Sequence, residues 1–108
     1  MNTDHNNIKP NFDYYKKDLR KICKDFNVRR LSCFGSVNTD KFKQDSDIDL
    51  LVTFGDSEGN DIFERYFGLK ERLEELFKRN VEIVFDKKFK NPFFRESVNK
   101  TKRVIYER

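Results

Sequence analysis

Hydrophobic and polar positions along the chain follow two periods, one helical and one extended. Apolar residues recur every three or four positions between residues 11 and 27, which predicts a helix capped by Asn11. A second helical stripe starts at the capping-box pair Asp61 and Glu64, with Asn60 as the alternative cap. Gly68 inside this stripe costs about 1 kcal/mol relative to alanine. The apolar positions of the two stripes are Phe12, Tyr15, Leu19, Ile22, Cys23 and Phe26, then Ile62, Tyr66, Leu69, Leu73 and Leu76.

Short apolar runs between these helices predict strands at residues 28–34, 47–54 and 81–85. The middle run suits a central strand covered on both faces, because only two acids and Thr53 interrupt it. Residues 37–46 are mostly polar and predict a short helix or a loop.

The secondary-structure patterns are weaker at both ends of the chain. Residues 1–10 are polar and predict a flexible tail, so residues 11–108 are expected to form the single domain that a chain of 108 residues allows. Pro92 suits the first position of a short helix, and residues 104–106 form either a fourth strand or a tail. The alternation of helices and strands predicts an α/β layered fold.

The composition narrows the class of protein. Hydrophobic residues make up 36% and charged residues 39% of the chain, and no apolar run approaches the roughly 18 residues of a membrane span. The polar N-terminus lacks the apolar stretch of a signal peptide, so we expect a cytoplasmic protein. The net charge of +4 would attract a polyanion such as ATP, but the scattered basic residues do not favour a nucleic-acid surface. Cys23 and Cys33 are interpreted as core hydrophobes rather than as metal ligands or a disulfide.

Phenylalanine is abundant, with 12 copies, and most of these side chains are expected in the core. Four of them leave two interpretations open. The helical spacing favours burial against the sheet, and the alternative is an exposed patch that docks a partner. These four residues are Phe63, Phe67, Phe93 and Phe94.

Carboxylates interrupt two of the predicted strands. Asp47 and Asp49 are two positions apart, so a strand would point both side chains to one face while Ile48 enters the core. Buried acids are costly unless they are compensated, and Mg²⁺ compensates them because it prefers oxygen ligands. Glu82 can join this cluster if the two strands are neighbours, and with two metal ions the cluster would suit phosphoryl transfer. The alternatives are a turn cap for Asp47, a solvated strand end for Asp49 and an exposed edge for Glu82.

A Gly35-Ser36 turn ends the first predicted strand shortly before these acids. Glycine permits a tight turn and a close approach of the backbone to a phosphate. Backbone N–H groups and the Ser36 hydroxyl could hold terminal phosphate oxygens. Alone, the dipeptide is also an ordinary turn, but its position before Asp47 and Asp49 predicts chemistry on a nucleoside triphosphate.

Together these segments resemble the signature of the polymerase-β-like nucleotidyltransferase superfamily. That signature is a hydrophobic residue with Gly-Ser, a polar spacer, Asp-hydrophobic-Asp, and a further acid on a later strand. The matching segments are Phe34-Gly35-Ser36, Asp47-Ile48-Asp49-Leu50-Leu51-Val52 and Val81-Glu82-Ile83-Val84. With the short length, the pattern is similar to the minimal nucleotidyltransferase (MNT) group from about Val28 onward, which implies a small mixed sheet flanked by helices.

The resemblance also implies a reaction. A nucleoside monophosphate, most simply AMP from ATP, would pass to an acceptor hydroxyl with release of pyrophosphate. Asp47 and Asp49 would bind two Mg²⁺ ions, and Glu82 would bind one of them and help to deprotonate the acceptor. Gly35 and Ser36 would hold the triphosphate. The acceptor would lie on a HEPN-type toxin, for which the chain would act as antitoxin.

Two departures from the family pattern keep other functions open. Asn38-Thr39-Asp40 stands where many members carry Ala-Arg-Gly, and Glu82 stands where the third acid is often aspartate. The alternatives are a nucleotide-binding antitoxin with weak or no catalysis and a small-molecule transferase of the aminoglycoside type. The intact set of three acids favours the active enzyme, and a length that leaves no room for an acceptor domain favours a partner protein as the acceptor.

Overall fold

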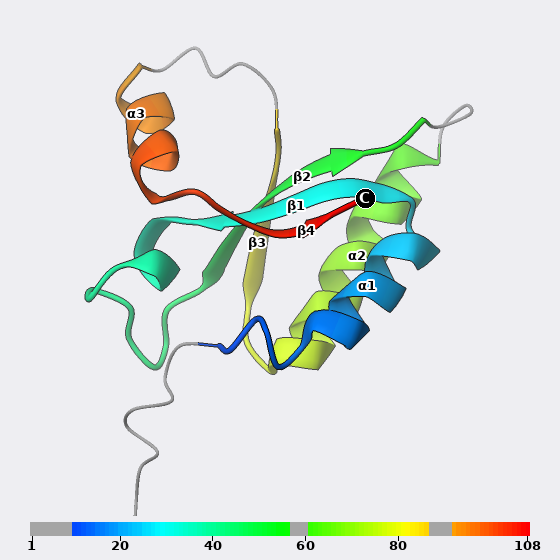
Figure 1. Ribbon diagram of the computed structural model, residues 1–108, viewed down its shortest axis with the longest axis horizontal. Coiled ribbons are helices and arrows are strands. Elements are labelled where there is room, and N and C mark those ends of the chain that lie inside the picture. Colours follow the sequence, from blue (N-terminus) through cyan, green and yellow to red (C-terminus); the bar gives the residue numbers. More distant parts are fainter. Residues whose placement is uncertain (1–9, 57–60, 87–91) are drawn as a thin grey trace, which may run out of the picture.

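The computed structural model describes residues 10–56, 61–86 and 92–108. Within these ranges it has one four-stranded mixed sheet and three α-helices (Figure 1), which confirms the predicted α/β fold. In chain order the elements are α1 (Lys16–Asp25), β1 (Val28–Phe34), the short 3-10 helix η2 (Gly35–Asn38), β2 (Ile48–Phe54), α2 (Ile62–Phe77), β3 (Val81–Phe85), α3 (Pro92–Thr101) and β4 (Arg103–Glu107). Residues 1–9 of the predicted tail lie outside the described ranges.

The strands are ordered β3-β2-β1-β4 across the sheet. β1 pairs antiparallel with β2 and with β4, and β2 pairs parallel with β3. The parallel register places Asp49 opposite Glu82, so the two acid-bearing strands are neighbours, as the metal-site prediction requires. Residues 103–107 form a fourth strand, which decides between the two interpretations of the C-terminus.

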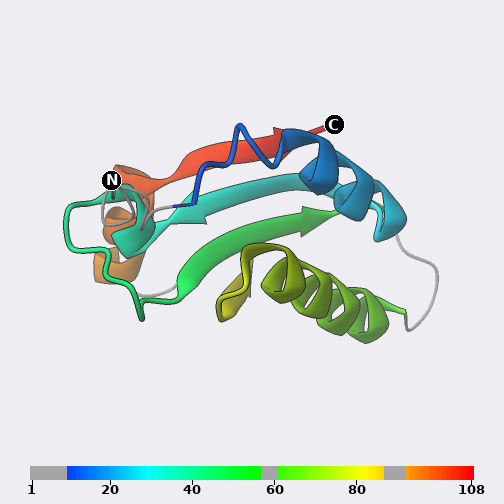
Figure 2. The same cartoon turned by 90° about the horizontal axis from the view of Figure 1, so that it is seen from below.

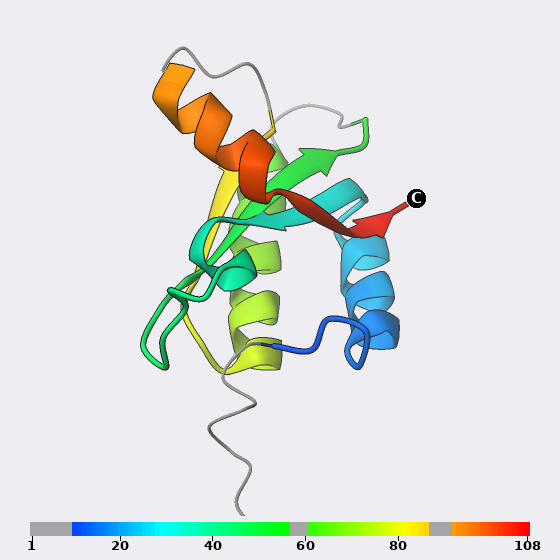
Figure 3. The same ribbon diagram turned by 60° about the vertical axis from the view of Figure 1, so that its left-hand side comes forward.

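The helices α1 and α2 lie on one side of the sheet, and α3 lies on the other side (Figure 3). The main core fills the space between the first two helices and the strands. Its fully buried members include Leu19 and Cys23 of α1, Leu69 and Leu73 of α2, and Leu31, Cys33, Ile48, Leu50 and Val52 of the strands. Cys23 and Cys33 are free thiols in this core, which confirms their predicted role, and burial raises the pKa of Cys23 to about 12.

A smaller cluster lies under α3 and consists of Phe34, Leu51 and Val98, with Val84 packed against it. Strand residues two positions apart share a face, so Asp49 lies on the same face as Leu51, and Glu82 lies on the same face as Val84. Figure 2 shows α3 and η2 together at the end of the sheet where β1 finishes. The acids and the Gly-Ser turn therefore meet beside α3, away from the main core.

Neither of the two predicted cap side chains bonds to the backbone of its helix. The Asn11 side chain accepts a hydrogen bond from the Tyr14 N–H (3.1 Å), and it therefore caps a turn that precedes α1, which begins only at Lys16. Asp61 is the N-cap residue of α2, as predicted, but its side chain makes no cap bond and its carboxylate lies 3.4 Å from a guanidinium nitrogen of Arg65 instead. The alternative cap, Asn60, lies outside the described ranges. The C-terminus of α2 is closed by Lys78 in the left-handed conformation, with φ +54°.

The expected burial of four phenylalanines is also wrong. Phe63, Phe67 and Phe93 are 69%, 62% and 82% exposed, and Phe94 is 37% exposed. Because Leu69 and Leu73 occupy the side of α2 that faces the sheet, Phe63 and Phe67 point outward. No helix in the described ranges is long and apolar enough to cross a membrane.

Gly68 lies inside an unbroken α2 because the Phe26 ring packs over it. A Cβ at this position would lie 2.4 Å from the ring. Alanine would gain about 1 kcal/mol of helix propensity, but displacing a packed ring costs about 1–3 kcal/mol. We expect Gly68→Ala to lower the free energy of unfolding by about 1 kcal/mol in urea denaturation, since overpacking outweighs propensity. Phe26→Leu in the same chain should restore part of the loss, and a more stable single variant would contradict this account.

Candidate active site

Gly35 begins η2 directly after β1, where the chain turns. Its φ of +77° lies in the left-handed region that glycine adopts without a steric penalty. A Cβ at this position would lie 2.9 Å from Oδ2 of Asp49. The backbone conformation and the close approach of the carboxylate therefore both require glycine here.

The three predicted acids lie at the same end of the sheet. Asp49 and Glu82 are the second residues of β2 and β3 and are paired across the two strands. Asp47 lies in the loop one residue before β2, because the strand begins at Ile48 rather than at Asp47 as predicted. Burial raises the pKa of the Asp49 carboxyl, and the negative charges of Asp47 and Glu82 raise it further. Asp49 therefore lies near enough to both other carboxylates to be affected by their charges.

The donor set fits a hard divalent cation. Asp49 is half-buried, whereas Asp47 and Glu82 are exposed, and Glu82 lies on the edge strand that one interpretation of the sequence proposed. In the described part of the chain, no three His, Cys, Asp or Glu side chains already enclose a space for an ion. Mg²⁺ takes few protein carboxylates and fills its remaining positions with water and phosphate oxygens. Joint binding of metal by the three acids stays a prediction.

Lys70 and Glu74 of α2 hold the beginning of β3, one residue before Glu82. The Val81 N–H donates to Oε2 of Glu74 (3.0 Å), and Lys70 Nζ lies 3.2 Å from the same oxygen. Lys70 Nζ also donates to the Val81 carbonyl. Both backbone groups of Val81 are therefore bound by α2, which fixes the position at which the Glu82 strand starts.

This arrangement predicts a pH-dependent stability. The hydrogen bond from Val81 lowers the pKa of Glu74 below its ordinary value of 4.5, and Lys70 adds to this effect against partial burial. A carboxylate whose pKa is lower in the folded than in the unfolded protein stabilises the fold at pH values above its unfolded pKa. This stabilisation is lost as the pH falls through the folded pKa. Glu74→Gln should therefore reduce the free energy of unfolding at neutral pH, and the difference should shrink below about pH 4.

Urea denaturation of both proteins over the acid range measures this difference. Glu75→Gln is the matched control, because Glu75 is the adjacent acid on the same helix and makes no such bond to β3 among the described residues. A difference between wild type and Glu74→Gln that is constant with pH would show that the charge of Glu74 is not involved.

Arg79 holds the loop that carries Asp47. Its guanidinium donates to the carbonyls of Ser46 (2.7 Å) and Lys43 (3.1 Å) and lies 4.5 Å from the centroid of the Phe42 ring. Because Ser46 directly precedes Asp47, Arg79 links this loop to the beginning of β3. No local sequence pattern singles out Arg79, because its contacts are with residues far away in the chain.

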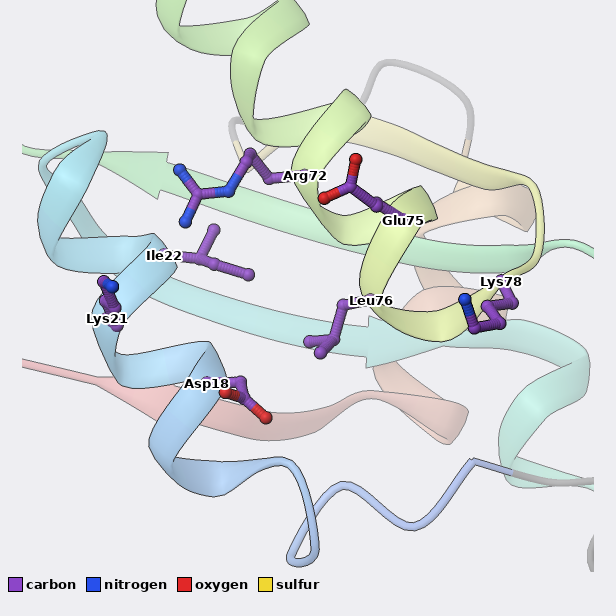
Figure 4. Close-up of a pocket in the computed structure, with 7 residues that line it drawn as sticks. All are labelled: Asp18, Lys21, Ile22, Arg72, Glu75, Leu76 and Lys78. Carbon is purple, nitrogen blue, oxygen red and sulfur yellow. The ribbon is translucent and has the colours of Figure 1, made fainter.

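A hollow of about 420 Å³ between α1 and α2 is separate from this site (Figure 4). It is lined by Asp18, Lys21, Ile22, Arg72, Glu75, Leu76 and Lys78. Basic and acidic side chains are mixed around it, so its charge does not favour a triphosphate. It lies on the helical side of the sheet, whereas Asp49 and Glu82 lie on the side of α3, and the Gly35 turn therefore remains the candidate active site.

The sequence profile of the family described as "Polymerase beta, Nucleotidyltransferase" matches residues 17–108. The chain belongs to this family. The match covers Gly35, Ser36 and the three acids, which is the set that the sequence signature identified. The protein is therefore a nucleotidyltransferase, and its sheet with flanking helices is the fold expected of a minimal member.

Named relatives place this nucleotidyltransferase among small members of the family. Protein adenylyltransferase MntA of Thermococcus cleftensis is 34% identical over 77 residues, which are 71% of this chain and 72% of MntA. A solved chain described as a minimal nucleotidyltransferase is 31% identical with a TM-score of 0.64, and the match covers 84% of this chain and 89% of that chain.

A more distant solved chain has the same fold. It comes from a complex of an MNT antitoxin with a tri-AMPylated HEPN toxin of Shewanella oneidensis. It is 16% identical to the nucleotidyltransferase with a TM-score of 0.59, and the match covers 91% of this chain and 74% of that chain.

Proposed function

We propose that this nucleotidyltransferase transfers AMP from ATP to a hydroxyl group of a partner protein in the presence of Mg²⁺. The observation that carries the proposal is the half-buried Asp49, which approaches Gly35 and is paired with Glu82. Oxygen ligands beside a left-handed glycine turn suit a metal-bound triphosphate. The names of the relatives, a protein adenylyltransferase and an antitoxin bound to an AMPylated HEPN toxin, support a HEPN-type toxin as the acceptor and an antitoxin role.

Each residue of the site has a role in this reaction. Asp47, Asp49 and Glu82 hold the metal, which when bound neutralises charge on the triphosphate and on the departing pyrophosphate. Glu82 accepts the proton of the acceptor hydroxyl, whose oxygen attacks the α-phosphorus of ATP. The bond between the α-phosphorus and the α–β bridging oxygen breaks, and pyrophosphate leaves. Gly35 lets the backbone approach the phosphates, and Ser36 binds them.

The test is incubation with ATP, Mg²⁺ and the protein encoded by the adjacent gene. Intact-mass spectrometry should show addition of one or more AMP groups to that protein, together with an equal amount of pyrophosphate. A chelator should prevent both. Pyrophosphate release without a mass gain would indicate transfer to a hydroxyl outside the partner protein, such as that of water. The absence of both, despite nucleotide binding, would indicate an antitoxin that binds ATP without catalysis.

A further inference from the structure

Two polar side chains that the proposed mechanism does not use connect the Gly35-Ser36 turn to α3. Oγ1 of Thr101, the last residue of α3, accepts a hydrogen bond from the Gly35 N–H (2.8 Å). The same hydroxyl donates to the Ser97 carbonyl one helical turn earlier (2.9 Å). Because its proton is given to Ser97, the oxygen of Thr101 is oriented as an acceptor toward Gly35.

Asn38, the last residue of η2, makes the second connection. Its Nδ2 donates to the Thr101 carbonyl (2.5 Å) and to the Cys33 carbonyl (3.3 Å). Two carbonyl partners require the NH₂ end of the amide to face them. The Cys33 sulfur lies 3.4 Å from Nδ2 and 3.5 Å from Oδ1 of the same amide. The side chain therefore joins the end of β1 to the end of α3 across the turn.

We propose that Thr101 and Asn38 are positioning residues that hold the Gly35-Ser36 turn in the conformation that receives the terminal phosphates of the nucleotide. The inference rests on the proposed function, because the ligand is its triphosphate. Neither residue touches the reacting atoms. Both act through the turn. Thr101 binds the Gly35 N–H, and the Asn38 side chain binds the carbonyls of Cys33 and Thr101.

These bonds decide which groups of the turn remain for a phosphate. The Gly35 N–H is already used by Thr101. The Ser36 carbonyl accepts bonds from the N–H (2.9 Å) and the hydroxyl (3.0 Å) of Thr39, which fixes the orientation of that peptide. No residue in the described ranges bonds to the Ser36 hydroxyl. The hydroxyl of Ser36 therefore remains for a phosphate, and its direction depends on the two connections.

The connections also protect the close approach of the turn to Asp49. A Cβ added at Gly35 would lie 2.9 Å from Oδ2 of Asp49, so the turn and this carboxylate are close neighbours, and the two connections fix their separation. An alanine side chain at position 38 would form none of these bonds.

The test compares variants that keep the shape of Thr101 or keep its hydroxyl. Thr101→Val preserves the branched side chain but removes both hydrogen bonds, whereas Thr101→Ser preserves the bonds. The probe is α,β-methylene-ATP with Mg²⁺, because nucleotidyl transfer cannot cleave its α–β bridge, and affinity is measured by isothermal titration calorimetry. We expect Thr101→Val and Asn38→Ala to weaken binding about tenfold, and Thr101→Ser to bind as wild type does.

Gly68→Ala is the control for general loss of stability, because it disturbs α2 without touching the turn. It should lower the melting temperature and leave the affinity for the analogue unchanged. The inference is overturned if Thr101→Val and Asn38→Ala bind like wild type, if Thr101→Ser binds as weakly as Thr101→Val, or if Gly68→Ala weakens binding equally. If wild type itself fails to bind the analogue, both the proposed function and this inference are wrong. The three outcomes above, in which wild type binds, overturn only the inference.

Discussion

Asp49→Asn is expected to lower the rate of nucleotidyl transfer by at least about 10³-fold, because a metal ligand contributes several kcal/mol to the transition state. Asp49 is the half-buried member of the acid cluster and the one that lies against Gly35. Pyrophosphate release from ATP measures the effect. Glu107→Gln is the matched control, since Glu107 is an acid on the opposite edge strand that pairs with Arg30 (3.4 Å). A rate near that of wild type would refute the role of Asp49.

The same substitution should not destabilise the fold. Burial and the charges of Asp47 and Glu82 raise the pKa of Asp49 above its ordinary value of 3.8. At pH values above about 4, the ionised carboxylate therefore lowers the stability of the fold. In metal-free buffer, the amide should therefore raise the melting temperature at neutral pH, and the gain should disappear below about pH 4. A variant that unfolds more easily than wild type at neutral pH would show that the carboxylate is structural.

Gly35→Ala is expected to lower the transfer rate by about 10²-fold or more, because a displacement of about 1 Å at a catalytic group has this effect. The left-handed φ of +77° would add a backbone penalty of about 1–2 kcal/mol to the free energy of unfolding. The added Cβ, 2.9 Å from Oδ2 of Asp49, would displace the carboxylate or the turn. Activity assays and urea denaturation on the same sample measure both effects.

Gly55→Ala is the control for this prediction. Gly55 follows the end of β2 that is remote from Asp49. A Cβ at Gly55 would lie close to the side-chain ends of Arg108 (2.7 Å) and Asn27 (2.8 Å), and these side chains can move away. This variant should retain the transfer rate whatever its effect on stability. Equal losses of activity in both glycine variants would show that the site responds to stability rather than to the approach of Gly35 to Asp49.

Local sequence patterns were sufficient for most of the fold. The strands at residues 28–34 and 81–85 have the predicted bounds, because each is a short apolar run between turn-forming residues. The predicted cap bonds failed where a competing contact decides the outcome: Asn11 binds Tyr14 in a preceding turn, and Asp61 pairs with Arg65. Such competition depends on geometry that spacing alone does not describe.

The candidate site could also be predicted only in part from the sequence. The Gly-Ser turn and the three acids have a recognisable spacing, and the parallel register of β2 and β3 was the only further condition for Asp49 and Glu82 to be neighbours. The residues that hold the site in place have no such spacing. Arg79 contacts Ser46, and Thr101 contacts Gly35, across 33 and 66 positions of sequence. Contacts of this kind are set by the packing of helices on the sheet and appear only in three dimensions.

The proposed reaction requires Asp47, Asp49 and Glu82 to bind a divalent cation together with the triphosphate. Titration of Mn²⁺ in place of Mg²⁺, followed by electron paramagnetic resonance in the presence of α,β-methylene-ATP, tests it most directly. We expect wild type to bind Mn²⁺ only when the nucleotide analogue is present, and we expect this binding to be lost in both Asp49→Asn and Glu82→Gln. Mn²⁺ binding that is unchanged in these two variants would contradict it.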